Sequence, residues 1–139
     1  MRKVQQDSCY LTIGEASRLI KSRKLSPVEL TRAFLERIDA VDRRVKSYVT
    51  LLADSAVAEA RAAEAEILRG SYRGRLHGIP LALKDLYDTK GVRTTAQSKV
   101  LEHRVPKADA TVTAKLREAG AIILGKLAMH EFAVGGPQT

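Results

Sequence analysis

The 139-residue sequence predicts an α/β protein in which N-terminal helices precede a β-α-β unit. Two short runs, 79–83 and 121–124, are almost entirely apolar, which is typical of strands covered on both faces of a sheet. A long connection with a helical pattern separates them, so we expect parallel pairing and a right-handed crossover. Two helix-start signals lie upstream. We therefore expect a sheet with helices on both faces.

A capping box predicts the start of each of the two N-terminal helices. In this motif, the side chains of a Ser or Thr and of a Glu three residues later each accept a hydrogen bond from the backbone N–H of the other. The box Thr12–Glu15 begins a helix that should end near Lys21. The box Ser26–Glu29, with Pro27 at the first helical position, begins a helix that should end near Arg44. Apolar residues recur at three- and four-residue steps in both, which gives each helix one apolar stripe.

A short strand is predicted over 48–52, before a third helix. Asp54 or Ser55 is the expected cap of that helix, which should end near Arg69. Its inner face is rich in alanine and can approach a neighbour closely. That face is formed by Ala56, Ala60, Ala63 and Ile67. A basic loop over 71–78 follows.

The second half of the chain contains the expected β-α-β unit. The strand 79–83 leads into a mostly irregular segment, 85–106. Asp109 is the expected cap of a helix over 110–119, and the second apolar strand, 121–124, completes the unit.

Composition favours a cytoplasmic protein. The single Cys9 excludes an internal disulfide and fits a reducing compartment. The start, Met1–Asp7, lacks the apolar core of a signal peptide, and no run reaches transmembrane length, so no membrane partner is expected.

The net charge of +8 raises the alternative of a basic nucleic-acid-binding module. Basic residues gather in 18–24, 32–46 and 69–75. Acidic residues interleave with the second group, which is typical of a solvated helix face. Aromatic residues make up only 4% of the chain, which leaves few surfaces on which bases could stack. These patterns do not favour a nucleic-acid partner.

Two apparent motifs fail on inspection. The run 120–127 has phosphate-loop spacing, but Leu127 replaces the magnesium-binding Ser or Thr and an apolar strand replaces the loop. Lys126 is therefore predicted to be a solvated lysine at a strand end. His77, His103 and His130 lack ligand spacing, so no zinc site is expected and each should lie in a loop or be partly exposed.

Lys84 is the candidate functional residue, because it ends the first apolar strand. Open parallel sheets place ligands at the carboxyl ends of their strands. Leu83 and Leu86 would desolvate an amine that pointed inward. Desolvation lowers the pKa of a lysine towards neutrality, as a general base requires. The alternative is a lysine that simply reaches into solvent.

Five short blocks follow one another along the chain: Gly78–Asp85, Thr89–Thr95, Asp109–Val112, Leu116–Ala121 and Gly125–Phe132. In this order they resemble the amidase signature family. The resemblance is dense over about residues 74–136, and it implies the mixed-sheet fold of that family, with helices on both faces.

The resemblance also implies a serine hydrolase that cleaves amides with a Ser–cis-Ser–Lys triad and no metal or organic cofactor. The catalytic lysine of the family falls on Lys84, which as a neutral amine would take a proton from the bridging serine. Backbone N–H groups near the nucleophile would hold the oxyanion. Met129 falls near the substrate pocket of the family, with ordinary core packing as its alternative.

The sequence departs from the family in two ways. Ala128 stands where the family commonly has asparagine. The Gly-Gly-Ser-Ser-Gly-Gly signature is absent and is expected beyond Thr139. Ser98 is the one serine after Lys84, and it lacks the glycines of a nucleophile turn.

We therefore interpret 1–139 as the N-terminal fragment of one amidase domain, with a helical region (1–70) and the start of the α/β core (71–139). Alone it should be inactive, because it lacks the nucleophile, and it should expose apolar strand edges. The partner of the complete enzyme would be a small-molecule amide. Alternatives are the A subunit of a tRNA-dependent amidotransferase, although 132–137 looks more like plain amidases, and a non-catalytic remnant.

Overall fold

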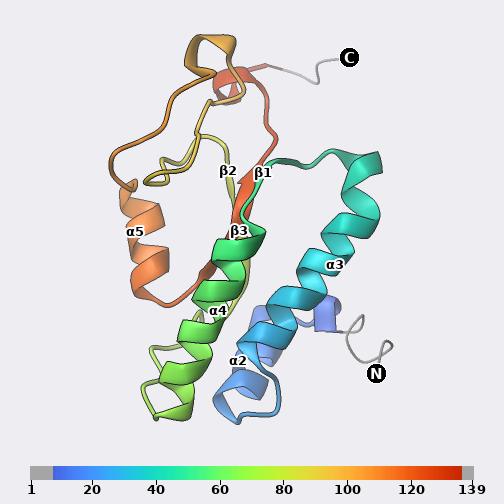
Figure 1. Ribbon diagram of the computed structural model, residues 1–139, viewed down its shortest axis with the longest axis vertical. Coiled ribbons are helices and arrows are strands. Elements are labelled where there is room, and N and C mark those ends of the chain that lie inside the picture. Colours follow the sequence, from blue (N-terminus) through green and yellow to red (C-terminus); the bar gives the residue numbers. More distant parts are fainter. Residues whose placement is uncertain (1–7, 136–139) are drawn as a thin grey trace.

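The computed structural model describes residues 8–135 (Figure 1). The predicted leaderless start, Met1–Asp7, and most of the predicted terminal loop, Gly136–Thr139, lie outside these residues. The helices are α2 (Ile13–Lys21), α3 (Pro27–Val45), α4 (Ala53–Leu68) and α5 (Thr111–Glu118), and the strands are β1 (Tyr48–Leu51), β2 (Pro80–Lys84) and β3 (Ile122–Leu127). Short 3-10 turns are η1 (Ser8–Tyr10), η2 (Lys99–Leu101) and η3 (Glu131–Ala133).

The three strands form one mixed sheet in the order β1-β3-β2. β2 and β3 are parallel, as the sequence predicted, and β1 is antiparallel to β3. β3 runs three residues beyond the predicted end at Leu124. Gly125 and Lys126 continue the strand because each pairs with both neighbours, Gly125 with Leu51 and Ala82, for example.

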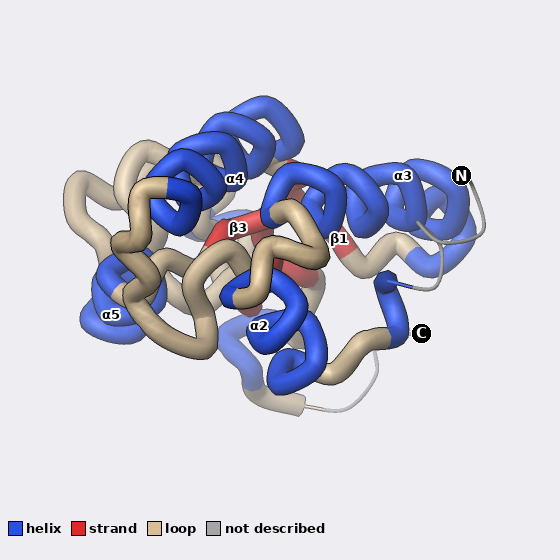
Figure 2. The backbone as a smooth tube through the Cα atoms, turned by 90° about the horizontal axis from the view of Figure 1, so that it is seen from below, coloured by secondary structure: helices blue, strands red, loops and turns tan. Residues whose placement is uncertain are grey.

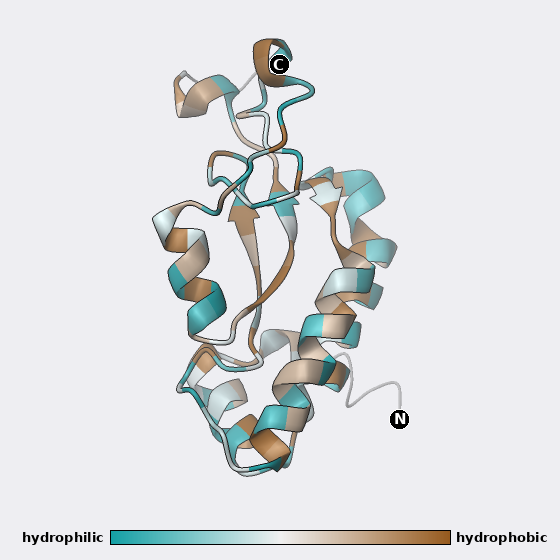
Figure 3. Cartoon of the chain, turned by 60° about the vertical axis from the view of Figure 1, so that its left-hand side comes forward, coloured by the Kyte–Doolittle hydropathy of each residue, from teal (hydrophilic) through white to brown (hydrophobic). Residues whose placement is uncertain are grey.

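α3 and α4 lie side by side over the sheet, as the view from below shows (Figure 2). α5 lies on the other side of the strands from α3 (Figures 1 and 3). The predicted alanine face of α4 is buried, and Ala56 and Ala60 pack with Ile122 and Leu124 of β3. Apolar colour concentrates on the strands in Figure 3, while the helices alternate between apolar and polar bands. The expected layering of helices on both sides of the sheet is confirmed.

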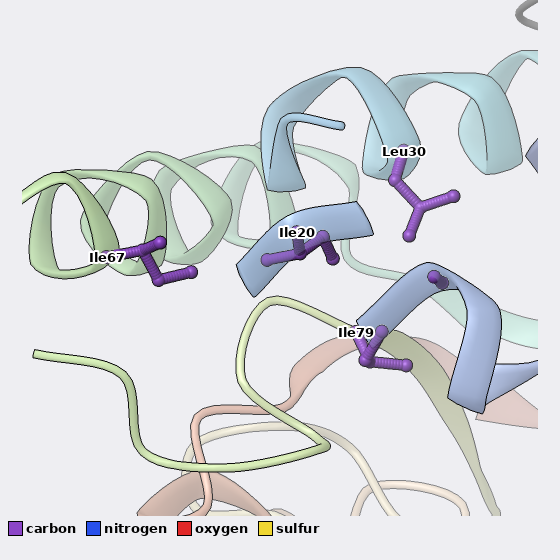
Figure 4. Packing of buried hydrophobic residues seen from close by; sticks show 5 residues of the cluster. Ile20, Leu30, Ile67 and Ile79 are labelled. Carbon is purple, nitrogen blue, oxygen red and sulfur yellow. The ribbon is translucent and has the colours of Figure 1, made fainter. Parts of the chain in front are cut away.

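A second apolar cluster fixes the point at which the chain enters β2 (Figure 4). Ile20 of α2, Leu30 of α3, Ile67 of α4 and Ile79 meet there, each at most 6% exposed. Burial of side chains of this size stabilises the fold by about 1.5–3 kcal/mol each. Because Ile79 directly precedes β2, this cluster anchors the strand that ends in Lys84.

The cap predicted for the third helix is wrong. α4 begins at Ala53 after Leu52, and no side chain caps it. Leu52 donates its backbone N–H to Leu124 of β3 (2.8 Å), so sheet pairing continues up to the first turn of the helix. Ser55 lies inside that turn, and its hydroxyl donates to the Leu52 carbonyl (3.2 Å). The predicted caps, Asp54 and Ser55, are therefore both helical residues.

The cap predicted for the fourth helix is also wrong. α5 begins at Thr111 after Ala110, again without a side-chain cap. Asp109 instead accepts a hydrogen bond from the backbone N–H of Lys90 (2.6 Å) and lies 3.2 Å from the Nε of Arg117. Its carboxylate therefore ties the irregular segment after β2 to α5. The two capping boxes, on α2 and α3, form as predicted.

Within residues 8–135, no helix combines the length and the apolar character that crossing a bilayer requires.

Candidate active site

Lys84 is the last residue of β2 and pairs in register with Leu127 of β3. Successive residues of a strand point to opposite faces. Leu83 and Asp85 are accordingly buried, whereas Lys84 is exposed. Leu86, the expected apolar neighbour, is itself 45% exposed. The amine of Lys84 therefore meets solvent at the carboxyl end of the parallel strands.

Lys126 is the second lysine at this edge, and its predicted solvent exposure is wrong. It pairs with Leu83 and shares the buried face of the sheet with it, and its side chain is 0% exposed. The Nζ donates to the Tyr87 carbonyl (2.8 Å) and to Thr94 Oγ1 (2.7 Å). Asp85 Oδ1 lies 3.3 Å away as the ion-pair partner. The segment after β2 has folded over the lysine and supplies these groups.

Lys126 and Asp85 form a buried ion pair, in which the ammonium is more fully hydrogen-bonded than the Oδ1 atom of the carboxylate. Burial lowers the pKa of the Lys126 ammonium below its ordinary value, and the Asp85 carboxylate offsets part of that fall. Two hydrogen bonds and one ion pair engage the three N–H donors of the ammonium. Asp85 Oδ1 has the ammonium at ion-pair distance and takes no aligned hydrogen bond from the described residues.

The other carboxylate oxygen of Asp85 organises the loop that follows. Oδ2 accepts hydrogen bonds from the backbone N–H (3.0 Å) and the hydroxyl (2.6 Å) of Thr95. The backbone of Asp85 is also engaged, because its N–H donates to Leu127 (3.0 Å) and its carbonyl accepts from Ala96 (2.9 Å). Asp85 therefore joins β2, β3 and the loop at one point.

Met129, the second predicted site residue, lies just beyond β3 and is half-buried. Its backbone N–H donates to the side-chain carbonyl of Gln97 (3.2 Å), in the loop that Asp85 holds. The structure thus places Lys84 at the carboxyl end of β2 and Met129 just beyond the carboxyl end of the neighbouring parallel strand, β3. A hollow of about 390 Å³ opens at the same edge, and its apolar lining includes Leu86, Tyr87, Leu101 and Phe132.

Ser98 has a structural role at this edge. It is 3% exposed, and as the N-cap of η2 its Oγ accepts a hydrogen bond from the backbone N–H of Val100 (3.3 Å). Its burial and this capping bond agree with the sequence analysis, which did not assign it as a nucleophile.

His77 lies in the loop before β2, away from this edge, as predicted, and its side chain is buried there. The imidazole is 1% exposed, its Nδ1 accepts from the Arg73 N–H (3.1 Å), and its Nε2 lies 3.2 Å from a Glu66 oxygen. Burial lowers the pKa of His77. His103 is exposed and His130 half-buried, as predicted. Among residues 8–135, no three His, Cys, Asp or Glu side chains are grouped as metal ligands would be.

Sequence reasoning proposed Lys84 and Met129 as site residues and did not anticipate the buried Asp85–Lys126 pair. One signal was available, because Asp85 follows the first apolar strand and Lys126 lies at the end of the second. Parallel strands bring their carboxyl ends to the same edge, so opposite charges in these places are expected to meet.

The family model described as Amidase matches residues 29–138. Among curated proteins, the chain is 51% identical over 126 residues to the A subunit of glutamyl-tRNA(Gln) amidotransferase from Moorella thermoacetica, covering 91% of this chain and 26% of that protein. It is 51% identical over 125 residues to the protein of the same name from Geobacter metallireducens, covering 90% and 26%. The chain spans about a quarter of the length of the curated relatives it matches.

Solved structures of amidases also resemble this chain. Native peptide amidase from Stenotrophomonas maltophilia matches with a TM-score of 0.83 and 36% identity, over 88% of this chain and 26% of that chain. An amidase family protein from Bacillus anthracis matches with a TM-score of 0.83 and 32% identity, over 94% and 26%. Fatty acid amide hydrolase, at 23% identity and a TM-score of 0.85 over 90% and 22%, shows the shared fold. With the family match spanning most of its length, the chain belongs to the amidase family.

Proposed function

We propose that residues 1–139 form the N-terminal part of a longer serine-dependent amide hydrolase, in which Lys84 is the general base. Membership of the amidase family and the fourfold greater length of the relatives support this reading. The observation that carries it is the contrast between two lysines at one sheet edge. Lys126 is buried with its donors engaged, whereas within residues 8–135 the Nζ of Lys84 has no hydrogen bond or ion pair.

In the proposed reaction, the neutral amine of Lys84 accepts a proton from a bridging serine. That serine takes the proton of the nucleophilic serine, whose oxygen then attacks the amide carbonyl. The proton held by Lys84 returns along the same route to the departing amine. Both serines come from chain outside these 139 residues, and so does the cover that excludes water from Lys84. The isolated chain is therefore expected to be inactive.

Met129 is proposed to line the substrate pocket. Its main chain is fixed by Gln97, and its half-buried side chain lies at the same edge of the sheet as Lys84. A thioether in this place would offer an adaptable apolar contact to the acyl group of the amide.

A narrower candidate is the A subunit of an amidotransferase that acts on glutamyl-tRNA(Gln). The curated relatives quoted above carry that name at 51% identity, whereas the quoted amidase structures are 32–36% identical. The opposing argument, the likeness of 132–137 to plain amidases, rests partly on Gly136 and Pro137, which lie outside the described residues. Ammonia release from glutamine that depends on partner proteins and glutamyl-tRNA(Gln) would support the amidotransferase, and turnover of simple amides by the enzyme alone would support a plain amidase.

The test of the base is a pair of lysine variants in the complete enzyme. Lys84→Met should reduce ammonia release from the best amide in a panel by about 10²–10⁴-fold, since a positioned base contributes that much. Lys90→Met removes another exposed lysine beyond β2 and should leave the rate unchanged. The panel contains a short aliphatic amide, an aromatic amide, a peptide amide and glutamine. Retained turnover in Lys84→Met would remove Lys84 from the mechanism.

A further inference from the structure

The two lysines at the carboxyl edge stand on opposite faces of the sheet, on neighbouring strands. Lys84 is exposed, and Lys126 is buried against Asp85. We propose that Asp85, Thr94, Thr95 and Lys126 form a positioning cluster that holds both Lys84 and Met129 in place for the reaction. This inference rests on the proposed function. The four residues are positioning residues, because they act through Lys84 and Met129 and do not touch the substrate.

The cluster holds the turn that begins at Lys84 from both ends. At the near end, Asp85 is tied through its backbone and its carboxylate, as described above. At the far end, the Tyr87 carbonyl accepts a hydrogen bond from Lys126 (2.8 Å), while the Tyr87 N–H donates back to the Lys84 carbonyl (3.0 Å). The backbone of Lys84 is therefore held on both sides by hydrogen bonds that lead to Asp85 and Lys126, and the charged groups of these two residues are buried.

The same cluster reaches Met129 through Thr95. The Thr95 hydroxyl donates to Asp85 Oδ2 (2.6 Å) and accepts from the Gln97 N–H (3.1 Å). The Gln97 side chain then accepts from Met129 (3.2 Å). One continuous series of hydrogen bonds thus links the residue after Lys84 to the main chain of the proposed pocket residue.

Stability alone is a poor reason for these charges to be buried. Replacing a buried ion pair with well-packed apolar residues often leaves a protein equally stable or more so. A fully bonded ammonium does what an apolar pair cannot, since its directional bonds select one arrangement of the groups around it. Here those groups are the turn after Lys84 and the loop that carries Gln97.

Two matched pairs of variants test the cluster in the complete enzyme. Thr94→Val removes the hydroxyl that accepts from Lys126, and Thr95→Val removes the hydroxyl that donates to Asp85. Thr94→Ser and Thr95→Ser keep these hydroxyls. We expect each valine variant to lower kcat about 10- to 100-fold with little change in KM, since a misplacement of about 1 Å costs up to that much. Each serine variant should recover most of the rate.

The pH dependence of kcat/KM distinguishes a misplaced Lys84 from a smaller amount of folded enzyme. The acid limb of kcat/KM should be displaced in the valine variants, because this limb reports the ionisation of the essential base in the free enzyme and that base is no longer held in place. Competitive acetylation of Lys84, followed by mass spectrometry over the same pH range, should show the same displacement without relying on activity. Both displacements should be absent from the serine variants.

The inference is overturned if the valine variants keep the wild-type kcat, acid limb and Lys84 labelling. It is equally overturned if their activity falls only in proportion to the unfolded fraction, measured by circular dichroism, while the acid limb stays in place. Full activity of Lys84→Met refutes the proposed function instead. In that case the acetylation profile still decides the matter, because identical Lys84 labelling in Thr95→Val and Thr95→Ser shows that the cluster does not position the amine.

Discussion

Replacing Lys126 with methionine removes a buried ammonium while keeping a side chain of similar length. Asp85, 1% exposed, would then lose its counter-charge and keep the two hydrogen bonds from Thr95. The Tyr87 carbonyl and Thr94 would lose the donor that they now share. The change therefore leaves a buried carboxylate without its counter-charge and removes one hydrogen bond from each of two oxygen acceptors inside the protein.

The expected cost is a large share of the stability of the chain. Removing one partner of a buried ion pair destabilises a protein by about 3–5 kcal/mol. Domains of ordinary size are stable by about 5–15 kcal/mol in total. At the entropy of unfolding usual for a chain of this length, the loss corresponds to about 10–17 °C in the thermal midpoint.

Urea unfolding of the chain, followed by far-UV circular dichroism, measures this loss. Lys84→Met is the matched control, because it removes a lysine from the neighbouring strand that is exposed, and it should change the free energy of unfolding by less than about 0.5 kcal/mol. The double variant Asp85→Asn with Lys126→Met should be less destabilised than Lys126→Met alone, since no charge stays buried without a partner. Equal unfolding midpoints for Lys126→Met and Lys84→Met would refute the buried ion pair.

Three further predictions concern the scaffold. Because burial lowers the pKa of His77 below its ordinary value of 6.5, the unfolded chain takes up a proton first as pH falls, so stability should drop between pH 7 and pH 5. The urea midpoint of His77→Asn should drop less over this window, and parallel slopes would contradict the assignment. Gly125→Ala should cost about 1–3 kcal/mol more than Gly74→Ala in the same assay, because a Cβ at Gly125 collides with a backbone carbonyl of β1 whereas the space at Gly74 is open. Ser26→Ala should lose about 1 kcal/mol by removing a capping box, and Ser55→Ala, which removes no cap, should unfold close to wild type; equal losses would speak against the observed helix starts.

Much of the fold could be predicted because its signals are local. A capping box involves residues within one helical turn, so the starts of α2 and α3 can be read directly from the chain. The two apolar runs predicted the parallel pair β2 and β3, because only strands covered on both faces dispense with polar residues. The starts of α4 and α5 were mispredicted where the chain uses other contacts. Leu52 remains bonded to β3, and Asp109 bonds to Lys90 and Arg117.

Part of the candidate site was also predictable from the sequence, and part was not. Lys84 ends one parallel strand and Met129 follows the other, so their position at the same edge of the sheet was predictable, while their roles in catalysis are proposals. The burial of Lys126 was not predictable from its neighbours, since a lysine after an apolar run ordinarily reaches solvent.

By itself, the sequence determined the order of the helices and strands, the starts of α2 and α3, and the family that the chain joins, because periodicity, capping boxes and ordered blocks are properties of residues close together in the chain. Only the tertiary structure decided that Lys84 is exposed and that Lys126 is buried. The physical reason is that an ammonium can be buried only where acceptors converge on it, and Asp85, Tyr87 and Thr94 reach Lys126 only after the segment beyond β2 has folded back over β3.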